Sequence, residues 1–207
     1  MWCQKNSGIS QEGIKDLQIL RELGISDNPK IKNVNHLKNT LKVLFCCDNS
    51  INDEGIRELL VLKKLYVNNN PEIKNVNYFK ESLILLRCNG ENSGINQKGI
   101  QKLKILKDLE AYDNSKIKNV NHLKNTLISL LCSGNCGINQ EGIKELKILE
   151  KLNTFDNKKI INVNHLKSLR TLSCCQRNIN EKGRCELLNL YYLDAYDNDK
   201  CEKMEEN

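Results

Sequence analysis

One short pattern recurs along the whole chain and limits the folds that it can adopt. The pattern is L-x-x-L-x-φ-x-x-N, where φ is a small or apolar residue, and it returns at intervals of 20 to 23 residues. Complete or nearly complete copies begin at Leu20, Leu41, Leu62, Leu83, Leu106, Leu127, Leu149, Leu169 and Leu190, and Cys3 and Asn6 belong to an incomplete first copy. Because so short a unit cannot bury its own leucines, neighbouring units must stack to form a continuous core. We therefore predict a solenoid of about ten coils.

The pattern resembles the leucine-rich repeat signature, L-x-x-L-x-L-x-x-N-x-L. The resemblance covers the whole chain and implies an α/β solenoid, a right-handed superhelix. Each coil would add a short strand to a parallel sheet on the concave face, and short helices or 3-10 turns would form the convex face. We expect a single domain over residues 1–207, with incomplete first and last coils. Because we identify no polar capping units, we expect either a longer array or self-association through the uncapped ends.

Two kinds of coil alternate. One kind contains "INDEGIREL" (51–59), "INQKGIQKL" (95–103) or "INQEGIKEL" (138–146), which are similar to the "ITDEGL" segment of cysteine-containing leucine-rich repeats. In these segments Asn52, Asn96 and Asn139 are suited to cap a helix N-terminus. The other kind contains "IKNVNHLKNTL" at 31–41 and again at 117–127, with related copies at 73–83 and 160–169. Apolar residues three apart in this motif predict a tight helical or 3-10 turn.

An asparagine column is expected to face inward, where each amide can bond to backbone groups of its own coil and of the next. Its members are Asn6, Asn28, Asn49, Asn70, Asn114, Asn135, Asn157 and Asn198. Two copies depart from the pattern, because Asn92 comes one residue late and Arg177 occupies the asparagine place. We predict a local bulge at both positions.

The cysteines and histidines are interpreted as structural residues, and we predict no metal, no cofactor and no catalytic residue. The φ place is shared by cysteine, valine and alanine, which indicates a small buried position; its cysteines are Cys3, Cys46, Cys88, Cys132 and Cys174. Cys47 and Cys175 are expected on the concave face instead. His36, His122 and His165 recur at one place of the "NVNHL" motif, but alternate coils would separate such residues by roughly 10 Å. No two of them could then share a zinc ion.

Composition bears on the compartment and on the class of partner. The net charge is +6 without a dense Lys/Arg block, which does not indicate nucleic acid or an anionic membrane as the partner. The apolar runs are too short to span a bilayer, the start of the chain lacks a signal-peptide pattern, and no N-x-[ST] sequon occurs. We expect a cytoplasmic protein, located in the host cytoplasm if the source is a virus or a parasite.

Aromatic residues concentrate at the strand places that should face the concave surface. Eight of the ten aromatic residues lie there: Trp2, Phe45, Tyr66, Tyr112, Phe155, Tyr191, Tyr192 and Tyr196. An acidic column runs beside them, although aspartate before asparagine is equally explained by capping of the turn after each strand. We predict that a protein partner contacts Phe45, Tyr66, Tyr112, Asp113, Phe155, Asp156, Tyr192, Tyr196 and Asp197.

The sequence thus predicts a non-catalytic protein-protein interaction module that binds its partner on the concave face. Three alternatives remain open. The chain could be the substrate-recognition part of a ubiquitin-ligase-type adaptor, as the family resemblance allows. It could be a structural or cell-surface array without a dedicated ligand. It could also bind nucleic acid through lysines on the convex side, in which case affinity would fall steeply with salt.

Overall fold

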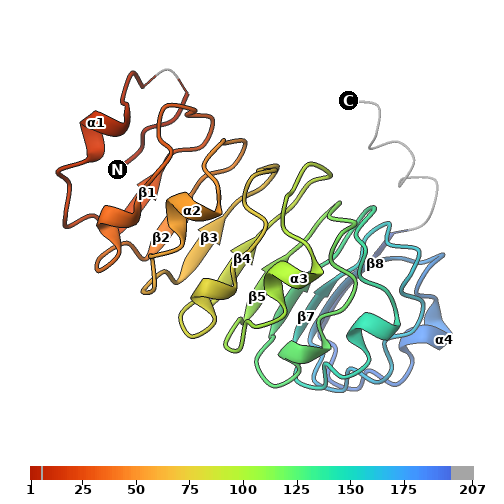
Figure 1. Ribbon diagram of the computed structural model, residues 1–207. Coiled ribbons are helices and arrows are strands. Elements are labelled where there is room, and N and C mark those ends of the chain that lie inside the picture. The colour runs from red at the N-terminus through yellow and green to blue at the C-terminus, as the bar shows by residue number, and fades with distance from the viewer. Residues whose placement is uncertain (6, 197–207) are drawn as a thin grey trace. The chain divides into compact units, whose positions relative to one another are not determined.

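The structure is a computed structural model in which residues 1–5 and 7–196 are described. It divides into two compact units, Met1–Leu106 and Lys107–Asn207. Both units consist of stacked coils, and each coil after the first contributes one short strand and one helical segment or turn (Figure 1). In the following, unit 1 and unit 2 denote these two parts, and each is described by itself.

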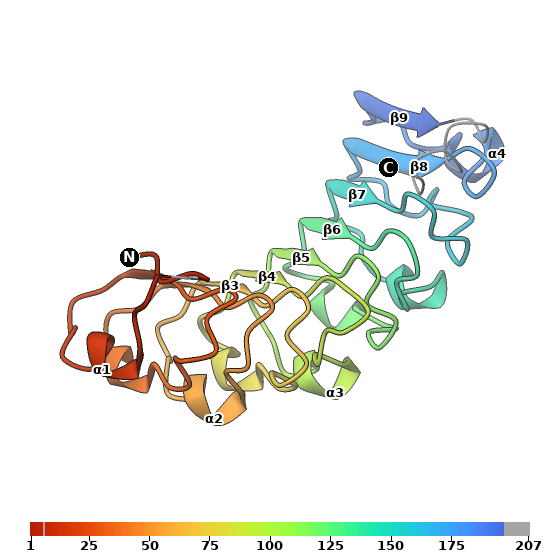
Figure 2. The same ribbon diagram turned by 90° about the horizontal axis from the view of Figure 1, so that it is seen from above.

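Unit 1 contains a parallel sheet whose strands follow chain order. The strands are β1 (Glu22–Gly24), β2 (Val43–Phe45), β3 (Lys64–Tyr66) and β4 (Leu85–Arg87). The helical segments are α1 (Gln11–Ile14), α2 (Asp53–Ile56) and α3 (Gln97–Ile100), with 3-10 turns η1 (Asn35–Leu37) and η2 (Asn77–Phe79) between them. Figure 2 shows α1, α2 and α3 on one side of this unit and the strands on the other. We call these the helical side and the sheet face.

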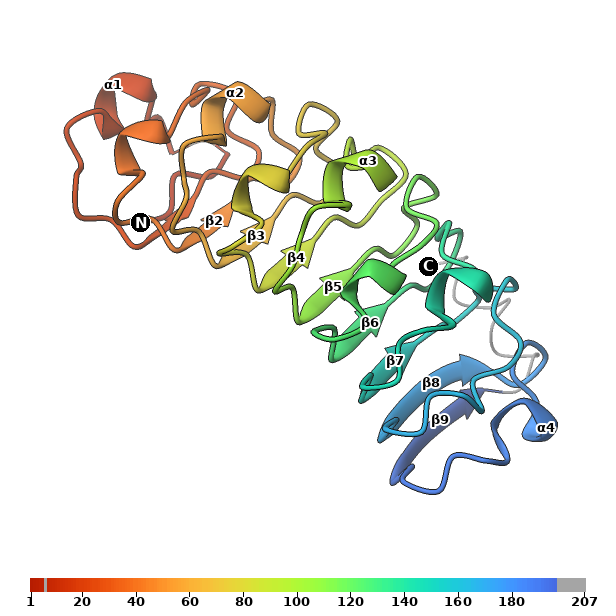
Figure 3. The ribbon, with the colours of Figure 1, turned by 60° about the horizontal axis from the view of Figure 1, so that its bottom comes forward.

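Unit 2 repeats the arrangement, as Figure 3 shows for its strands, which lie side by side. The strands are β5 (Asp108–Glu110), β6 (Ser129–Leu131), β7 (Lys151–Asn153), β8 (Thr171–Cys175) and β9 (Tyr192–Tyr196), all parallel. The helical segments are η3 (Asn121–Leu123), η4 (Glu141–Ile143) and α4 (Glu181–Arg184). The predicted coil architecture, with its parallel sheet and short helices or 3-10 turns, is confirmed.

The apolar residues of the pattern form the core. Leu44, Leu65, Leu86 and Leu109, which occupy the second leucine place, are fully buried. The five φ-place cysteines are also fully buried, as predicted. Burial raises the pKa of Cys46 and of Cys132 well above the usual value, so both thiols stay neutral and act as small apolar groups.

One φ-place residue, Thr154, carries a polar hydroxyl group. The Thr154 side chain is fully buried, and within residues 1–5 and 7–196 its hydroxyl oxygen has no hydrogen-bond partner. We expect Thr154→Val to raise the free energy of unfolding by about 1 kcal/mol, because a desolvated, unpaired hydroxyl is replaced by a methyl group of the same shape. Urea denaturation followed by circular dichroism measures the change. Thr40→Val is the control, since the Thr40 hydroxyl donates to Gln18 O at 3.1 Å and should not be improved by removal. A destabilised Thr154→Val protein would contradict this interpretation.

The asparagine column is confirmed at five places and wrong at one, while Asn6 and Asn198 lie outside the described residues. Its buried members are Asn28, Asn49, Asn70, Asn114 and Asn157. Asn135, however, is exposed, and Cys136 occupies the buried place. In the copy that begins at Leu83, Asn92 is likewise exposed and Ser93 is buried.

The length of each interval explains these two shifts. The copies at Leu83 and Leu127 are followed by the next leucine after 23 and 22 residues, against 21 for the equivalent copy at Leu41. In the copy at Leu83, two extra residues precede the buried place, which moves from the ninth position to Ser93. In the copy at Leu127, one extra residue moves it to Cys136. Gly90 and Gly134 begin these longer turns with φ values of 98° and 61°, which favour glycine. The bulge predicted at Asn92 is therefore confirmed, and the one at Asn135 was missed.

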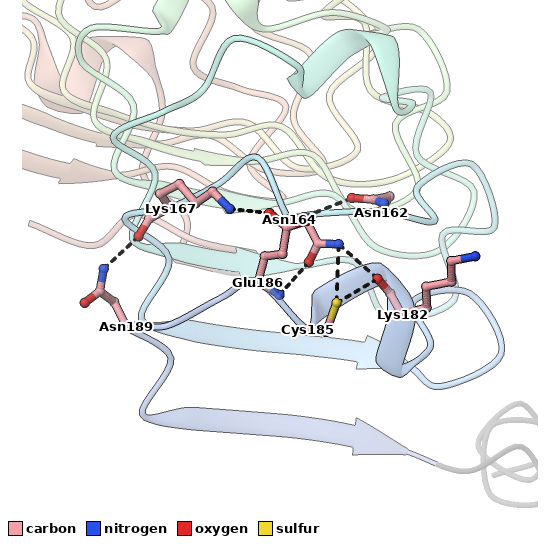
Figure 4. A network of polar contacts seen from close by, with 7 residues as sticks. All are labelled: Asn162, Asn164, Lys167, Lys182, Cys185, Glu186 and Asn189. Atoms are coloured by element: carbon pink, nitrogen blue, oxygen red, sulfur yellow. Dashed lines mark hydrogen bonds and ion pairs between the residues drawn. The ribbon is translucent and has the colours of Figure 1, made fainter.

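The repeated "NVN" motif joins the coil that contains it to the next coil. In Figure 4, Asn164 Nδ2 donates to Lys182 O at 2.9 Å, and Asn164 Oδ1 accepts from the Glu186 amide at 3.0 Å. The same pair of bonds, to the helical segment of the following coil, is made by Asn35, Asn77 and Asn121. The fidelity of the motif thus reflects a repeated structural clamp.

The helical segments begin as the sequence predicted. Asn52 accepts from the Gly55 amide, and Asn96 accepts from the amides of Lys98 and Gly99. Asn139 accepts from Gly142 at 2.9 Å, although the segment that follows it is a 3-10 turn. The 3-10 turns predicted for the other kind of coil are present in three copies, whereas the copy at 160–169 contains only turns.

Candidate partner-binding face

The sheet face of unit 1 carries a continuous row of aromatic rings. Phe45 and Tyr66 occupy the same place in β2 and β3, and their rings stack with centroids 4.1 Å apart and an interplanar angle of 13°. On one side Trp2 packs against Phe45 at 4.9 Å. On the other side the Arg87 guanidinium lies over the Tyr66 ring, 5.1 Å from its centroid. We call Trp2, Phe45, Tyr66 and Arg87 the aromatic ladder.

A glycine makes the ladder continuous. Gly24 is the residue of β1 that pairs with Phe45, and Trp2 forms a parallel bridge with Gly24. A Cβ atom at Gly24 would lie 2.2 Å from Cε3 of Trp2, so only glycine lets the indole lie across this strand. The indole thereby lies over Gly24 and reaches the Phe45 ring, although the two residues belong to coils that are not adjacent.

The sheet face of unit 2 also carries exposed aromatic rings. Tyr112 follows β5 and has 47% of its surface exposed, while Tyr192 in β9 has 52% exposed. Phe155 follows β7 and is half-buried. Because Phe155 occupies the coil after the next one from Tyr112, the two residues are roughly 10 Å apart along the sheet.

The aspartates beside these rings have a conformational role. Asp27, Asp48, Asp113 and Asp156 all adopt the left-handed backbone region, with φ between 46° and 57°. Asn69 has the same place and the same conformation with φ of 51°, so the place selects the short polar side chains that tolerate this region and not negative charge. The alternative interpretation of the acidic column, as residues of the turn after each strand, therefore has a direct structural basis.

Two of these carboxylates nevertheless have defined surroundings. Asp113 Oδ1 accepts from the Asn135 amide at 2.8 Å, which holds this carboxylate over the turn of the next coil. Partial burial and, secondarily, the neighbouring Asp27 carboxylate raise the pKa of Asp48.

Some predicted positions turn out differently or are not described. Asp197 lies outside the described residues, and for Tyr196 the structure describes only the backbone, which pairs with Cys175 in β8. The expected exposure of Cys175 is wrong: its side chain is 3% exposed, and its sulfur accepts from the Asp156 amide at 3.4 Å. Cys47 is half-buried, and burial raises the pKa of its thiol, so it is not an activated nucleophile.

The ladder itself was not foreseen as a unit. The sequence does contain the pattern that could have predicted it. The fifth place of the first five copies is occupied, in order, by Trp2, Gly24, Phe45, Tyr66 and Arg87. Phe45 and Tyr66 were predicted as contacts, whereas Arg87 was missed because a cation above a tyrosine ring depends on strand register. Parallel pairing of Tyr66 with Arg87 supplies that register.

The histidines lie on the helical side and tie coils together. His36 Nε2 lies 2.9 Å from Ile14 O, and His165 Nε2 lies 3.1 Å from Ile143 O, each in the preceding coil. Within the part of the chain that the structure describes, no three potential metal-binding side chains converge. The described residues also contain no helix of the length and apolarity that a bilayer span requires.

Comparison with known proteins identifies structures of similar fold. No family model and no curated protein matches the sequence. The functional domain of InlJ from Listeria monocytogenes, which includes a cysteine ladder, aligns with a TM-score of 0.56 at 19% identity over 85% of this chain. An internalin, InlF, from the same organism aligns with a TM-score of 0.59 at 19% identity over 95% of this chain. A structure of the yeast complex of Rad7 and Elc1 aligns with a TM-score of 0.61 at 16% identity over 88% of this chain.

The chain spans only 39%, 62% and 57% of the lengths of these three chains. At such low identity the similarity is one of fold.

Proposed function

We propose that this leucine-rich-repeat solenoid is a non-catalytic module that binds another protein through the aromatic residues of its sheet face. The observation that carries the proposal is the exposure of rings that the core does not need. Leucine, isoleucine and cysteine fill the core, whereas Tyr112 and Tyr192 remain about half exposed on the sheet face. Exposed aromatic residues gathered on one face are typical of protein-binding surfaces.

The proposed contacts are those that the sequence predicted, with the ladder added. Phe45, Tyr66, Tyr112, Phe155 and Tyr192 provide apolar contact area, and Asp113 and Asp156 provide polar contacts at the edge. Tyr196 and Asp197 remain part of the proposal, although the structure does not describe their side chains. A similar fold occurs in the yeast complex of Rad7 and Elc1, which supports a protein as the class of partner.

We keep the cytoplasm as the proposed location. Cys3, Cys46, Cys132, Cys136 and Cys174 are buried free thiols that pack in the core, which differs from the disulfide framework of small secreted domains.

Affinity capture with matched variants tests the proposal. We expect the double variant Tyr112→Ala/Tyr192→Ala to lose at least one partner that the unaltered chain captures from cell extract, as identified by mass spectrometry. Truncation of exposed aromatic contact residues commonly reduces affinity about tenfold or more. Tyr78→Ala is the control, because Tyr78 is also exposed but lies in η2 on the helical side. If every captured protein survives the double change, or if Tyr78→Ala removes the same partners, the sheet face of unit 2 is not the binding site.

A further inference from the structure

We propose that the aromatic ladder of unit 1 binds an extended acidic peptide segment that carries apolar side chains. This inference rests on the proposed function and names the chemistry of the partner for one part of the sheet face. The apolar side chains would lie on the ring edges of the ladder, and the carboxylates would face a row of cationic residues beside it.

The cationic residues stand at the start of the strands that carry the ladder. Arg21, Lys42 and Lys63 occupy the second place of three successive copies, directly before β1, β2 and β3. Lys64 and Arg87 add positive charge within the strands, and Glu22 in β1 is the carboxylate among them. Within residues 1–5 and 7–196, Arg21, Lys42 and Lys63 take part in no ion pair. Their charges are therefore available to a partner.

Among the described residues, the helical side of unit 1 carries lysines within ion pairs and others outside them, such as Lys98 and Lys102. Several of its lysines are paired with a glutamate of a neighbouring coil, as in Lys38–Glu58 at 3.6 Å and Lys104–Glu81 at 2.7 Å. Such pairs contribute little to stability, but they offset the positive charge of that side. Arg21, Lys42 and Lys63 thus place positive charge outside ion pairs beside the partly exposed rings of the ladder, which favours an acidic partner with apolar side chains at this face by electrostatic complementarity.

The geometry of the rings favours a peptide over single-stranded nucleic acid. Nucleic acid binds to such surfaces by stacking its bases on exposed ring faces. In the ladder, however, Phe45 and Tyr66 stack on each other, and Arg87 covers the other face of the Tyr66 ring. For Phe45 and Tyr66 the ring edges remain accessible, and these suit aliphatic or aromatic side chains of a peptide.

The dimensions fit an extended segment. Trp2 and Arg87 are four coils apart, which corresponds to roughly 19 Å at the strand spacing of about 4.8 Å. An extended peptide covers this length with about six residues. The second place precedes the ladder by three residues, or roughly 10 Å along the strand, so carboxylates on one side of such a peptide would face Arg21, Lys42 and Lys63.

The test is selection of displayed random peptides of about ten residues on the full chain, long enough to cover the ladder. We expect the enriched peptides to contain an excess of Asp and Glu together with apolar residues. Against one enriched acidic peptide, we expect Lys42→Glu/Lys63→Glu and Phe45→Ala/Tyr66→Ala each to reduce affinity about tenfold or more in fluorescence anisotropy. Lys98→Glu/Lys102→Glu changes the charge equally on the helical side and should leave the affinity within about twofold.

Other outcomes would overturn the inference. Enrichment of basic or uncharged peptides, no enrichment at all, or equal loss of affinity in the Lys98/Lys102 control would each do so. Labelled poly(U) and poly(dT) are measured in parallel, and tighter binding of either than of the peptides, with loss in Phe45→Ala/Tyr66→Ala, would assign the ladder to nucleic acid. If the acidic preference fails while Tyr112→Ala/Tyr192→Ala still loses captured proteins, only the chemistry proposed for unit 1 is wrong.

Discussion

Asn157→Ala is expected to lower the free energy of unfolding by about 3 kcal/mol or more, because it removes several buried hydrogen bonds at once. Asn157 is fully buried, and its Nδ2 donates to Cys132 O at 2.7 Å and to Ile138 O at 2.9 Å. Its Oδ1 accepts from the Lys159 amide at 3.1 Å. Alanine would leave these backbone groups without a partner in the core. Urea denaturation followed by far-ultraviolet circular dichroism measures the loss.

Asn135→Ala is the matched control for this change. Both residues stand nine positions into their copies of the repeat, but Asn135 is displaced outward by the additional residue of its coil and is exposed. We expect Asn135→Ala to change the free energy of unfolding by no more than about 0.5 kcal/mol. Equal losses in the two variants would show that position in the pattern matters more than burial, contrary to the structure.

Asn157 and Asn135 show which parts of the fold can be predicted from the sequence. The repeat predicts stacked coils, parallel strands and a buried asparagine, because leucines at this fixed spacing can be buried only between stacked coils. It predicts the buried asparagine correctly at Asn28, Asn49, Asn70, Asn114 and Asn157, where no residue is inserted before the ninth place. It fails at Asn135, since one inserted residue rotates the next side chain outward and brings Cys136 into the core. The interval of 22 residues contains that information, but only the backbone shows where the insertion is absorbed.

The candidate site could be predicted only in part, for a related reason. Ring-bearing places such as Phe45 and Tyr66 follow from the alternation of side chains along a strand. Contacts between coils do not, because they depend on strand register and on side-chain orientation. The stacking of Phe45 on Tyr66, the cation of Arg87 and the space above Gly24 all belong to this second class. The aspartates needed the φ angles before their turn function could be recognised.

Four of the helical segments contain a glycine that packs against the backbone of the preceding coil. In four coils a Cβ atom on this glycine would lie between 2.0 and 2.4 Å from a carbonyl oxygen of the preceding coil; these residues are Gly55, Gly99, Gly142 and Gly183. The glycine carbonyl in turn accepts from the valine amide of the preceding "NVN" motif, as Gly142 O does from Val120 N at 2.9 Å. The two kinds of coil therefore alternate because each helical segment needs the tight turn of its neighbour.

Gly142→Ala is accordingly expected to lower the free energy of unfolding by about 2 to 3 kcal/mol. Its Cβ would lie 2.2 Å from Lys118 O, a backbone atom that cannot move without separating the two coils. That separation would also weaken the bond from Val120 N. Chemical denaturation gives the loss in stability, and hydrogen exchange should show faster exchange at the Val120 amide than in the unaltered chain.

Gly13→Ala tests this explanation, because the same four letters, QEGI, surround Gly13 and Gly142. A Cβ on Gly13 would meet only a side-chain atom, Cγ2 of Ile9, at 3.2 Å. Alanine also favours a helix by up to about 1 kcal/mol relative to glycine, so Gly13→Ala should be neutral or slightly stabilising. Opposite effects from identical local sequences would place the requirement for glycine in the packing of one coil on the next. If both substitutions destabilise the chain equally, the requirement lies within the helical segment instead.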